Sequence, residues 1–205
     1  LDDAVRDEAV SPGRALAAGA RAFAHALVAG LGVCSRAAVE RDGGGLTAGK
    51  DDDARRSLRR HRVRLGFKDA FVEDAFKDRA IQMRAALLAL WHQPDGTPPT
   101  PPPSGASSFL VGDRPHGYVV ACGFHIFEVD EVREEGGVER VVRVARAFRA
   151  DLIDDVATAL RSFTPPFSSP AVACEKLGCS HRALLPVLQF LGYRNDEKGL
   201  YVRGG

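Results

Sequence analysis

The forty residues 164–203 indicate the fold most clearly, and they read TPPFSSPAVACEKLGCSHRALLPVLQFLGYRNDEKGLYVR. Ser169 followed by Pro170 is typical of a helix start, because a serine oxygen can cap free backbone amides and the proline ring already holds a helical φ. Gly178 can adopt the left-handed conformation that ends such a helix, and Ser180 can cap the next one. Two helices joined by a short turn with glycine form a helix-turn-helix pattern.

A hairpin is predicted directly after the second helix. Short strand-like stretches flank the polar turn 195–199, which ends in glycine. A hairpin behind a helix-turn-helix predicts a winged-helix-like unit over residues 164–205. Pro186 lies inside the second helix, where a proline removes a hydrogen bond and crowds the preceding turn. Two alternatives follow: the helix kinks there, or residues 180–185 form an irregular lead-in and Pro186 opens a shorter helix.

Length and composition indicate a globular protein. The chain has 205 residues, of which 45% are hydrophobic and 27% charged, enough for one or two domains with a sizeable core. A net charge of +1 excludes a chain that is basic throughout, although local basic patches can still bind nucleic acid. No apolar run reaches the roughly eighteen residues of a membrane span, so we expect no membrane partner.

Three further features bear on processing and location. The acidic start, Leu1-Asp2-Asp3, is unlike a signal peptide. A first residue other than Met suggests an excised piece of a longer protein. Four scattered cysteines do not form a disulfide framework and predict reduced thiols, which favours a cytoplasmic location.

The predicted fold class is α+β and mostly helical, with four parts. We expect a helical region with a basic patch at 1–92, a proline-rich linker at 93–108, a β-hairpin with a packed helix at 109–163, and the winged-helix-like unit at 164–205. In the third part, alternating residues predict strands at 118–122, 124–132 and 138–144, a turn at 134–137 and a helix at 148–163.

Two long helices are predicted in the first part, over residues 11–31 and 78–92. Their expected inward positions are Leu16, Ala20, Phe23, Leu27 and Leu31 in the first helix, and Ile81, Ala85, Leu88 and Trp91 in the second. Trp91 lies on the apolar stripe, which favours a core position over a base-stacking role. Residues 34–39 predict another short helix, and residues 69–77 a connection.

The glycine-rich stretch 43–50 has part of a phosphate-binding motif. Gly44, Gly49 and Lys50 match its spacing, but Asp51 stands where a serine or threonine would hold Mg²⁺. The run of aspartates at 51–53 would also repel a triphosphate. The favoured interpretation is a loop that leads into an Asp-capped helix. We therefore expect neither a catalytic site nor a cofactor.

The densest basic patch lies between Arg55 and Lys68, a stretch with seven lysines and arginines and no acid. Phosphate is the natural partner of such a patch, whereas a solvated helix face paired with nearby carboxylates is the alternative. The predicted nucleic-acid-binding residues here are Arg55, Arg56, Arg59, Arg60, Arg62 and Arg64. A weaker second set on the C-terminal unit comprises His181, Arg182, Gln189, Arg194, Lys198 and Arg203.

A zinc site is a less favoured alternative. Its candidate ligands are Cys122, His125, Cys174 and Cys179. The spacing of the first pair suits a zinc knuckle, whereas that of the second pair is wide. Because cysteine is commonly a small buried hydrophobe, we expect no metal.

Several segments together resemble one known region. They are Arg64-Leu65-Gly66-Phe67, residues 85–91, residues 117–124, Leu177-Gly178-Cys179-Ser180 and Leu191-Gly192-Tyr193-Arg194. In this order they resemble the C-terminal, post-ATPase region of bacterial relatives of the suppressor-of-Var RNA helicases, the DExH-type helicases of the mitochondrial RNA degradosome. The resemblance covers about Leu16 to Arg194. The proline linker and the acidic hairpin look like insertions, and the helicase motifs themselves are absent.

This resemblance implies a non-catalytic accessory region of an ATP-dependent RNA helicase. Such a region would contact the backbone of single-stranded RNA and dock on the ATPase core of its parent helicase. The alternative is a protein–protein interaction scaffold built on a winged helix, without nucleic-acid binding.

Overall fold

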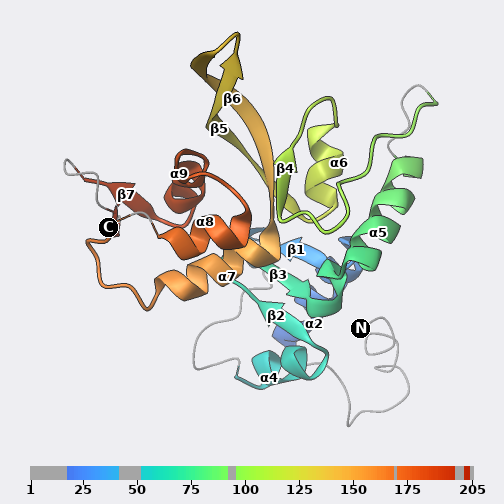
Figure 1. Ribbon diagram of the computed structural model, residues 1–205. Helices are drawn as coiled ribbons and strands as arrows, with labels where there is room; N and C mark the ends of the chain where they lie inside the picture. Colours follow the sequence, from blue (N-terminus) through green and yellow to red (C-terminus); the bar gives the residue numbers. More distant parts are fainter. Residues whose placement is uncertain (1–17, 42–51, 92–95, 169, 197–200, 204–205) are drawn as a thin grey trace. The chain divides into compact units, whose positions relative to one another are not determined.

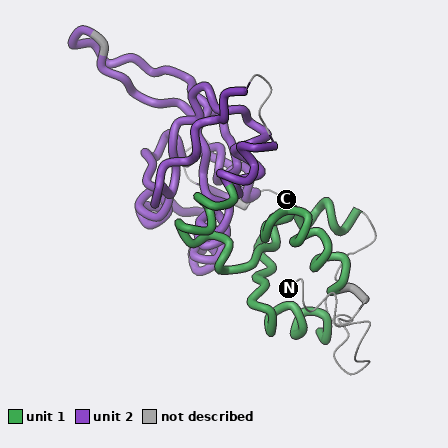
Figure 2. The backbone as a smooth tube through the Cα atoms, turned by 90° about the vertical axis from the view of Figure 1, so that its right-hand side faces the viewer, with its two compact units in different colours: residues 1–84 green, residues 85–205 purple. Residues whose placement is uncertain are grey.

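The computed structural model describes residues 18–41, 52–91, 96–168, 170–196 and 201–203 (Figure 1). The protein is mixed α+β with small antiparallel sheets, which confirms the predicted fold class. It divides into two compact units, residues 1–84 and 85–205 (Figure 2). The division into four parts stays a prediction. Within the described residues, the helices are too short or too polar to span a bilayer.

The first unit alternates helices with very short strands. Its elements are α2 (Ala18–Ala29), β1 (Val33–Ser35), α3 (Arg36–Val39), α4 (Asp52–Arg60), β2 (Val63–Leu65), β3 (Asp69–Val72) and the 3-10 helix η3 (Glu73–Phe76). The sheet has the order β1-β3-β2, and both pairings are antiparallel. Phe71 in the central strand therefore lies opposite Val33 on one side and Arg64 on the other.

Of two predictions for this unit, one is confirmed in part and one is wrong. The short helix predicted at 34–39 begins only at Arg36, as α3, because residues 34 and 35 belong to β1. Residues 69–77, predicted as a connection, contain the central strand β3. Strands of three or four residues are too short to show a clear alternation of apolar and polar side chains. The glycine-rich stretch 43–50 lies outside the described residues.

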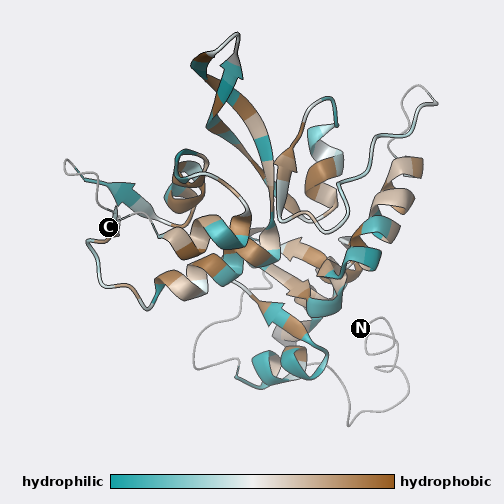
Figure 3. Cartoon of the chain, in the orientation of Figure 1, coloured by the Kyte–Doolittle hydropathy of each residue, from teal (hydrophilic) through white to brown (hydrophobic). Residues whose placement is uncertain are grey.

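The core of the first unit lies between α2, α4 and the sheet. Phe23 and Leu27 of α2 are buried together with Leu58 of α4 and Val63 of β2. Acidic residues begin α4 and arginines end it, an arrangement that suits the helix dipole. This packing turns the basic face of α4 away from the core, and Figure 3 shows the helix as strongly hydrophilic.

Helix α5 (Asp78–Trp91) carries a buried arginine. Arg84 is only 4% exposed. Its Nε donates to the carbonyl of Leu31 at 3.2 Å and its Nη2 to that of Ala75 at 3.0 Å. The guanidinium also lies 5.9 Å from the ring centroid of Phe76. This side chain ties α5 to the end of α2 and to η3.

The prediction that Trp91 is in the core is wrong, because its side chain is 86% exposed. The buried positions of α5 step by four residues, from Ile81 through Ala85 to Ala89. Trp91 lies two residues beyond Ala89, about 200° around the helix, and therefore on the opposite face.

The second unit is built on a three-stranded sheet and helices around it. Its elements are the end of α5, β4 (Ser108–Leu110), α6 (His116–Ala121), β5 (Phe124–Glu135), β6 (Val138–Arg149), α7 (Ala150–Leu160), α8 (Ala171–Leu177), α9 (His181–Phe190), β7 (Tyr193–Asn195) and β8 (Tyr201–Arg203). The sheet has the order β4-β6-β5. The predicted long hairpin is confirmed, with Gly136 and Gly137 at positive φ in its turn.

The strand predicted at 118–122 is wrong, because these residues belong mainly to α6. A short apolar run fits a buried helix turn as well as a strand, so its pattern does not separate the two. Tyr118 and Val119 are fully buried, and the Tyr118 hydroxyl donates to the carbonyl of Ala85 at 3.2 Å.

The helix-turn-helix of the tail has the predicted turn. α8 ends at Gly178, whose φ of 59° is left-handed. Ser180 caps α9, its side chain accepting from the amide of Ala183 at 3.3 Å. α9 runs without interruption from His181 to Phe190 with Pro186 inside it. The alternative of an irregular lead-in that ends at Pro186 is therefore wrong.

The tail repeats the connectivity of the first unit. Phe167 forms an antiparallel bridge with Tyr201, and β8 pairs with β7. The order of elements after α7 is thus a strand-like residue, two helices and two strands, with the last strand central. The first unit has the same order, in which the helix α2 is followed by β1, α3, α4, β2 and β3, and its last strand, β3, is also central.

Arg146 connects three parts of the second unit. From β6 its Nε donates to Ser108 Oγ in β4 at 3.1 Å, and its Nη2 donates to the carbonyl of Gly178 at 3.2 Å. It also forms an ion pair with Glu131 of β5. One guanidinium group therefore holds the turn between α8 and α9 against the sheet.

Candidate nucleic-acid interface

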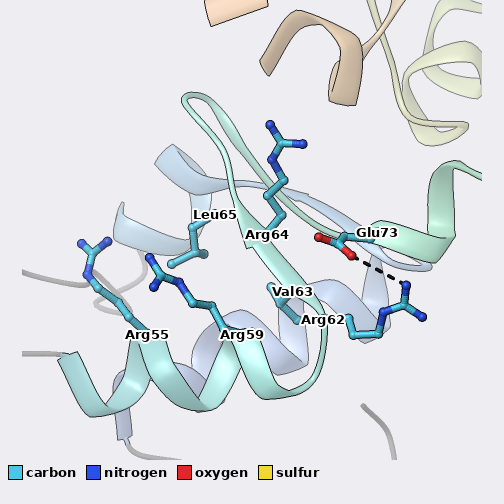
Figure 4. A pocket seen from close by; sticks show the side chains of 7 residues that line it. All are labelled: Arg55, Arg59, Arg62, Val63, Arg64, Leu65 and Glu73. Atoms are coloured by element: carbon cyan, nitrogen blue, oxygen red, sulfur yellow. Dashed lines mark ion pairs between the residues drawn. The ribbon is translucent and has the colours of Figure 1, made fainter. Parts of the chain in front are cut away.

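The basic patch surrounds a cavity of about 410 Å³ beside α4 and β2 (Figure 4). Arg55 and Arg59 lie one helical turn apart on α4 and line the cavity together with residues of β2. Four arginines and one glutamate line the cavity, together with two apolar residues. The lining residues are Arg55, Arg59, Arg62, Val63, Arg64, Leu65 and Glu73. We call Arg55, Arg56, Arg59, Arg60, Arg62 and Arg64 the arginine cluster.

Two members of the arginine cluster are paired with carboxylates. Arg56 Nη2 lies 2.7 Å from Asp53 Oδ1. Arg62 Nη1 lies 2.8 Å from Asp74 Oδ2, and its Nη2 lies 3.7 Å from Glu73 Oε2. A hydrogen bond from Lys77, and then the charge of Arg62, hold the pKa of the Asp74 carboxyl below its ordinary value. The positive charge of Arg62 is thus largely compensated.

The other members differ in their exposure and in the contacts that they make. Arg64 lies 5.7 Å from the ring centroid of Phe71, so an aromatic face supports its guanidinium. Arg59 and Arg60 are exposed at the end of α4. Among the residues that the structure describes, neither forms an ion pair. The excess positive charge of the cluster therefore lies mainly on α4, where a polyanion can reach it.

The second predicted set is not gathered at one place. His181 and Arg182 begin α9 and line a cavity of about 830 Å³, but Glu131, Glu175 and Arg146 line the same cavity, so its charge is mixed. Gln189 and Arg194 are exposed and do not line it. Lys198 lies outside the described residues, and Arg203 ends β8 with a side chain that is not described.

The helix α9 also has one face covered within its own unit. The Phe190 ring lies 5.1 Å from that of His125 and 5.4 Å from that of Phe127, both on β5. The long hairpin thus packs on α9, whereas the corresponding helix of the first unit, α4, carries the exposed arginines. The structure therefore favours the arginine cluster over the second set as a nucleic-acid interface.

The four candidate zinc ligands are not brought together. Within the described part of the chain, no group of three or more His, Cys, Asp or Glu side chains is placed to hold a metal ion. Cys122 is fully buried. Cys174 Sγ lies 3.4 Å from His181 Nδ1, and burial raises the pKa of Cys179 to about 12. Among the described residues, these four side chains therefore do not form an assembled metal site.

Sequence reasoning missed three residues that shape the arginine cluster. Glu73 and Asp74 follow β3 and meet Arg62, because the Glu73 amide donates to the Arg62 carbonyl at 3.1 Å. Arg36 donates from Nη1 to the carbonyl of Gly66 at 2.7 Å and holds the turn between β2 and β3. The positions of all three residues depend on β3, so they could have been found only if the sequence had predicted that strand.

Comparison with known proteins finds no match to this chain among protein-family models, curated proteins or solved structures. The proposals below therefore rest on the residues, the geometry and the resemblance given in the sequence analysis.

Proposed function

We propose that this chain is a non-catalytic accessory region of an ATP-dependent RNA helicase, and that its arginine cluster binds the backbone of single-stranded RNA. The observation that carries the proposal is the cavity beside α4 and β2, which four arginines and one glutamate line. A local excess of arginines favours phosphate as the partner. The choice of RNA, and of a helicase as the parent protein, comes from the resemblance of the sequence.

The connectivity of the first unit supports this role. A helix, a strand, two helices and a two-stranded hairpin, with the last strand in the centre, is the order of a winged-helix module. In a helix-turn-helix unit the second helix of the pair faces the nucleic acid. Here that helix is α4, which carries four arginines of the cluster. We infer that the tail is a second module of the same kind whose corresponding helix packs on the hairpin.

The chemistry of such an interface is electrostatic and largely independent of base sequence. Arginines that neutralise phosphates release the counterions condensed on the strand, so affinity falls as salt rises. The chain would hold RNA for the ATPase core of its parent helicase, with which it would be in contact. Its own net charge of +1 limits attraction to the local patch.

The test is a fluorescence anisotropy titration of a labelled single-stranded RNA at low salt. The cluster variant is Arg59→Ala with Arg60→Ala. The control variant is Arg79→Ala with Arg161→Ala, which removes the same charge from exposed positions outside the cluster. We expect the cluster variant to lose at least about tenfold in affinity and the control to match the wild type. Absence of wild-type binding, or equal losses in both variants, would refute the proposal.

An exposed apolar face of α5 favours the alternative, a protein-interaction scaffold. Met83, Leu87, Leu90 and Trp91 are between 54% and 86% exposed, and large exposed apolar patches mark interaction sites. The test is a pull-down with this chain as bait after nuclease treatment. The scaffold is favoured if the wild type retains a partner protein, the double variant Leu87→Ser with Trp91→Ser loses it, and the wild type does not bind RNA.

A further inference from the structure

The turn between β2 and β3 presents an aromatic ring beside the arginine cluster. The Gly66 amide donates to the Asp69 carbonyl at 2.8 Å and closes a turn with Phe67 and Lys68 at its tip. The Phe67 side chain is 40% exposed. The ammonium of Lys68 lies 5.1 Å from the centroid of that ring. The tip therefore combines a flat apolar surface with a positive charge.

The turn is held in place by α3. The guanidinium of Arg36 donates to the Gly66 carbonyl at 2.7 Å, and the Arg36 amide donates to the Lys68 carbonyl at 3.0 Å. Ser35 pairs with Asp69 across the sheet. Hydrogen bonds on both sides of the tip restrict its movement, so little conformational freedom is lost when a ligand binds there.

Phe67 differs from the neighbouring aromatic residues of the same unit. Phe71 and Phe76 are buried, and their rings pack edge to face with centroids 5.1 Å apart. A phenylalanine that is needed only for the core is placed like these two. Phe67 instead exposes its ring at the end of the hairpin.

Phe67 lies close to the cavity-lining residues along the chain. β2 carries Arg64 and Leu65, which line the cavity, and Figure 4 shows Arg64 extending from this strand beside the hairpin. Phe67 follows Leu65 by two residues, which is about 7 Å along an extended chain. A single strand whose phosphate meets the guanidinium groups can therefore place a neighbouring base against the ring.

We propose that Phe67, with Lys68, forms a base-stacking contact that makes the interface select unpaired nucleotides. This inference rests on the proposed function, because the arginine cluster must first hold the backbone. An aromatic side chain stacks on any base and so adds affinity without sequence preference, and a nearby cation adds to it. In a duplex the faces of the bases are covered by their neighbours, so a paired strand gains nothing from Phe67.

The experiment compares Phe67→Ala and Phe67→Tyr with the wild type on three ligands: a single-stranded RNA 12-mer, its duplex, and an abasic strand of equal length. Stacking is lost in Phe67→Ala, so we expect affinity for the single strand to fall by about tenfold. Phe67→Tyr keeps the ring and should bind like the wild type. The slope of log affinity against log salt should stay the same in both variants, because no phosphate contact is removed.

The abasic strand is the internal control, since it carries phosphates but no bases. The wild type and Phe67→Ala should bind it equally. If Phe67→Ala binds the single strand like the wild type while the cluster variant loses binding, the stacking inference fails and the proposed function stands. Equal affinity of the wild type for the single strand and the abasic strand would also overturn the inference. If the wild type binds none of the three ligands, both proposals fail.

Discussion

Replacing Arg59 and Arg60 with alanine should make RNA binding less sensitive to salt. Both side chains are exposed and, within the described residues, unpaired with acids, so each is free to displace counterions from a phosphate. On a single strand each phosphate contact contributes about 0.7 to the slope of log affinity against log salt. Losing two contacts therefore lowers the slope by about 1.4.

This change in slope gives a measurable ratio. When the salt concentration rises from about 50 to 200 mM, the ratio of the RNA affinity of the wild type to that of the cluster variant should fall by about sevenfold. The assay is the anisotropy titration at four or five salt concentrations, with circular dichroism to confirm that both proteins are folded. Since both arginines lie in the last turn of α4, their loss from the helix terminus should cost no more than about 1 kcal/mol in stability.

The outcome that refutes the reasoning is a cluster variant with the slope of the wild type. The same conclusion follows if the control variant, Arg79→Ala with Arg161→Ala, flattens the salt dependence equally. In either case the charge on α4 acts at long range through net charge alone, and the cavity makes no specific contribution.

Three further changes test the fold. Arg84→Met removes two hydrogen bonds to backbone carbonyls from a buried side chain and should lower the free energy of unfolding in urea by about 3 kcal/mol; a loss below about 1 kcal/mol would contradict this. Gly178→Ala should lower the free energy of unfolding by about 1–2 kcal/mol, which is more than Gly112→Ala should. Both glycines have a positive φ, but only at Gly178 would the new Cβ lie 2.7 Å from another atom, Ser107 Oγ. Burial raises the pKa of Cys179 to about 12 from 9.0. The stabilisation from its protonated thiol is complete below pH 9 and is lost as pH rises toward 12, so urea midpoints should fall less steeply with pH in Cys179→Ser; parallel curves would disprove this.

The sequence predicts the elements that carry strong local signals. α4 begins within a run of aspartates and the β5–β6 hairpin has two glycines in its turn, so these local residues specify both elements without help from the rest of the chain. The turn between α8 and α9 is equally well marked by Gly178 and Ser180. β1 and β3 have no such signal, because strands of three and four residues acquire their pairing from the folded unit.

The candidate site shows the same limit. The density of arginines from Arg55 onward predicts the patch, but not which of them are neutralised. Arg62 is compensated because β3 brings Glu73 and Asp74 to it, and this depends on a strand that the sequence does not reveal. Trp91 shows the reverse case: its apolar character suggested burial, whereas its angle on the helix places it in solvent.

Arg146 has a consequence for how the second unit opens. Because one guanidinium bonds Ser108, Gly178 and Glu131, these three segments share a single anchor. A local fluctuation that frees the turn after α8 must break the same side chain's hold on β4 and β5. Amide hydrogens in these segments should therefore exchange with deuterium in one cooperative step, and Arg146→Ala should separate that step into several.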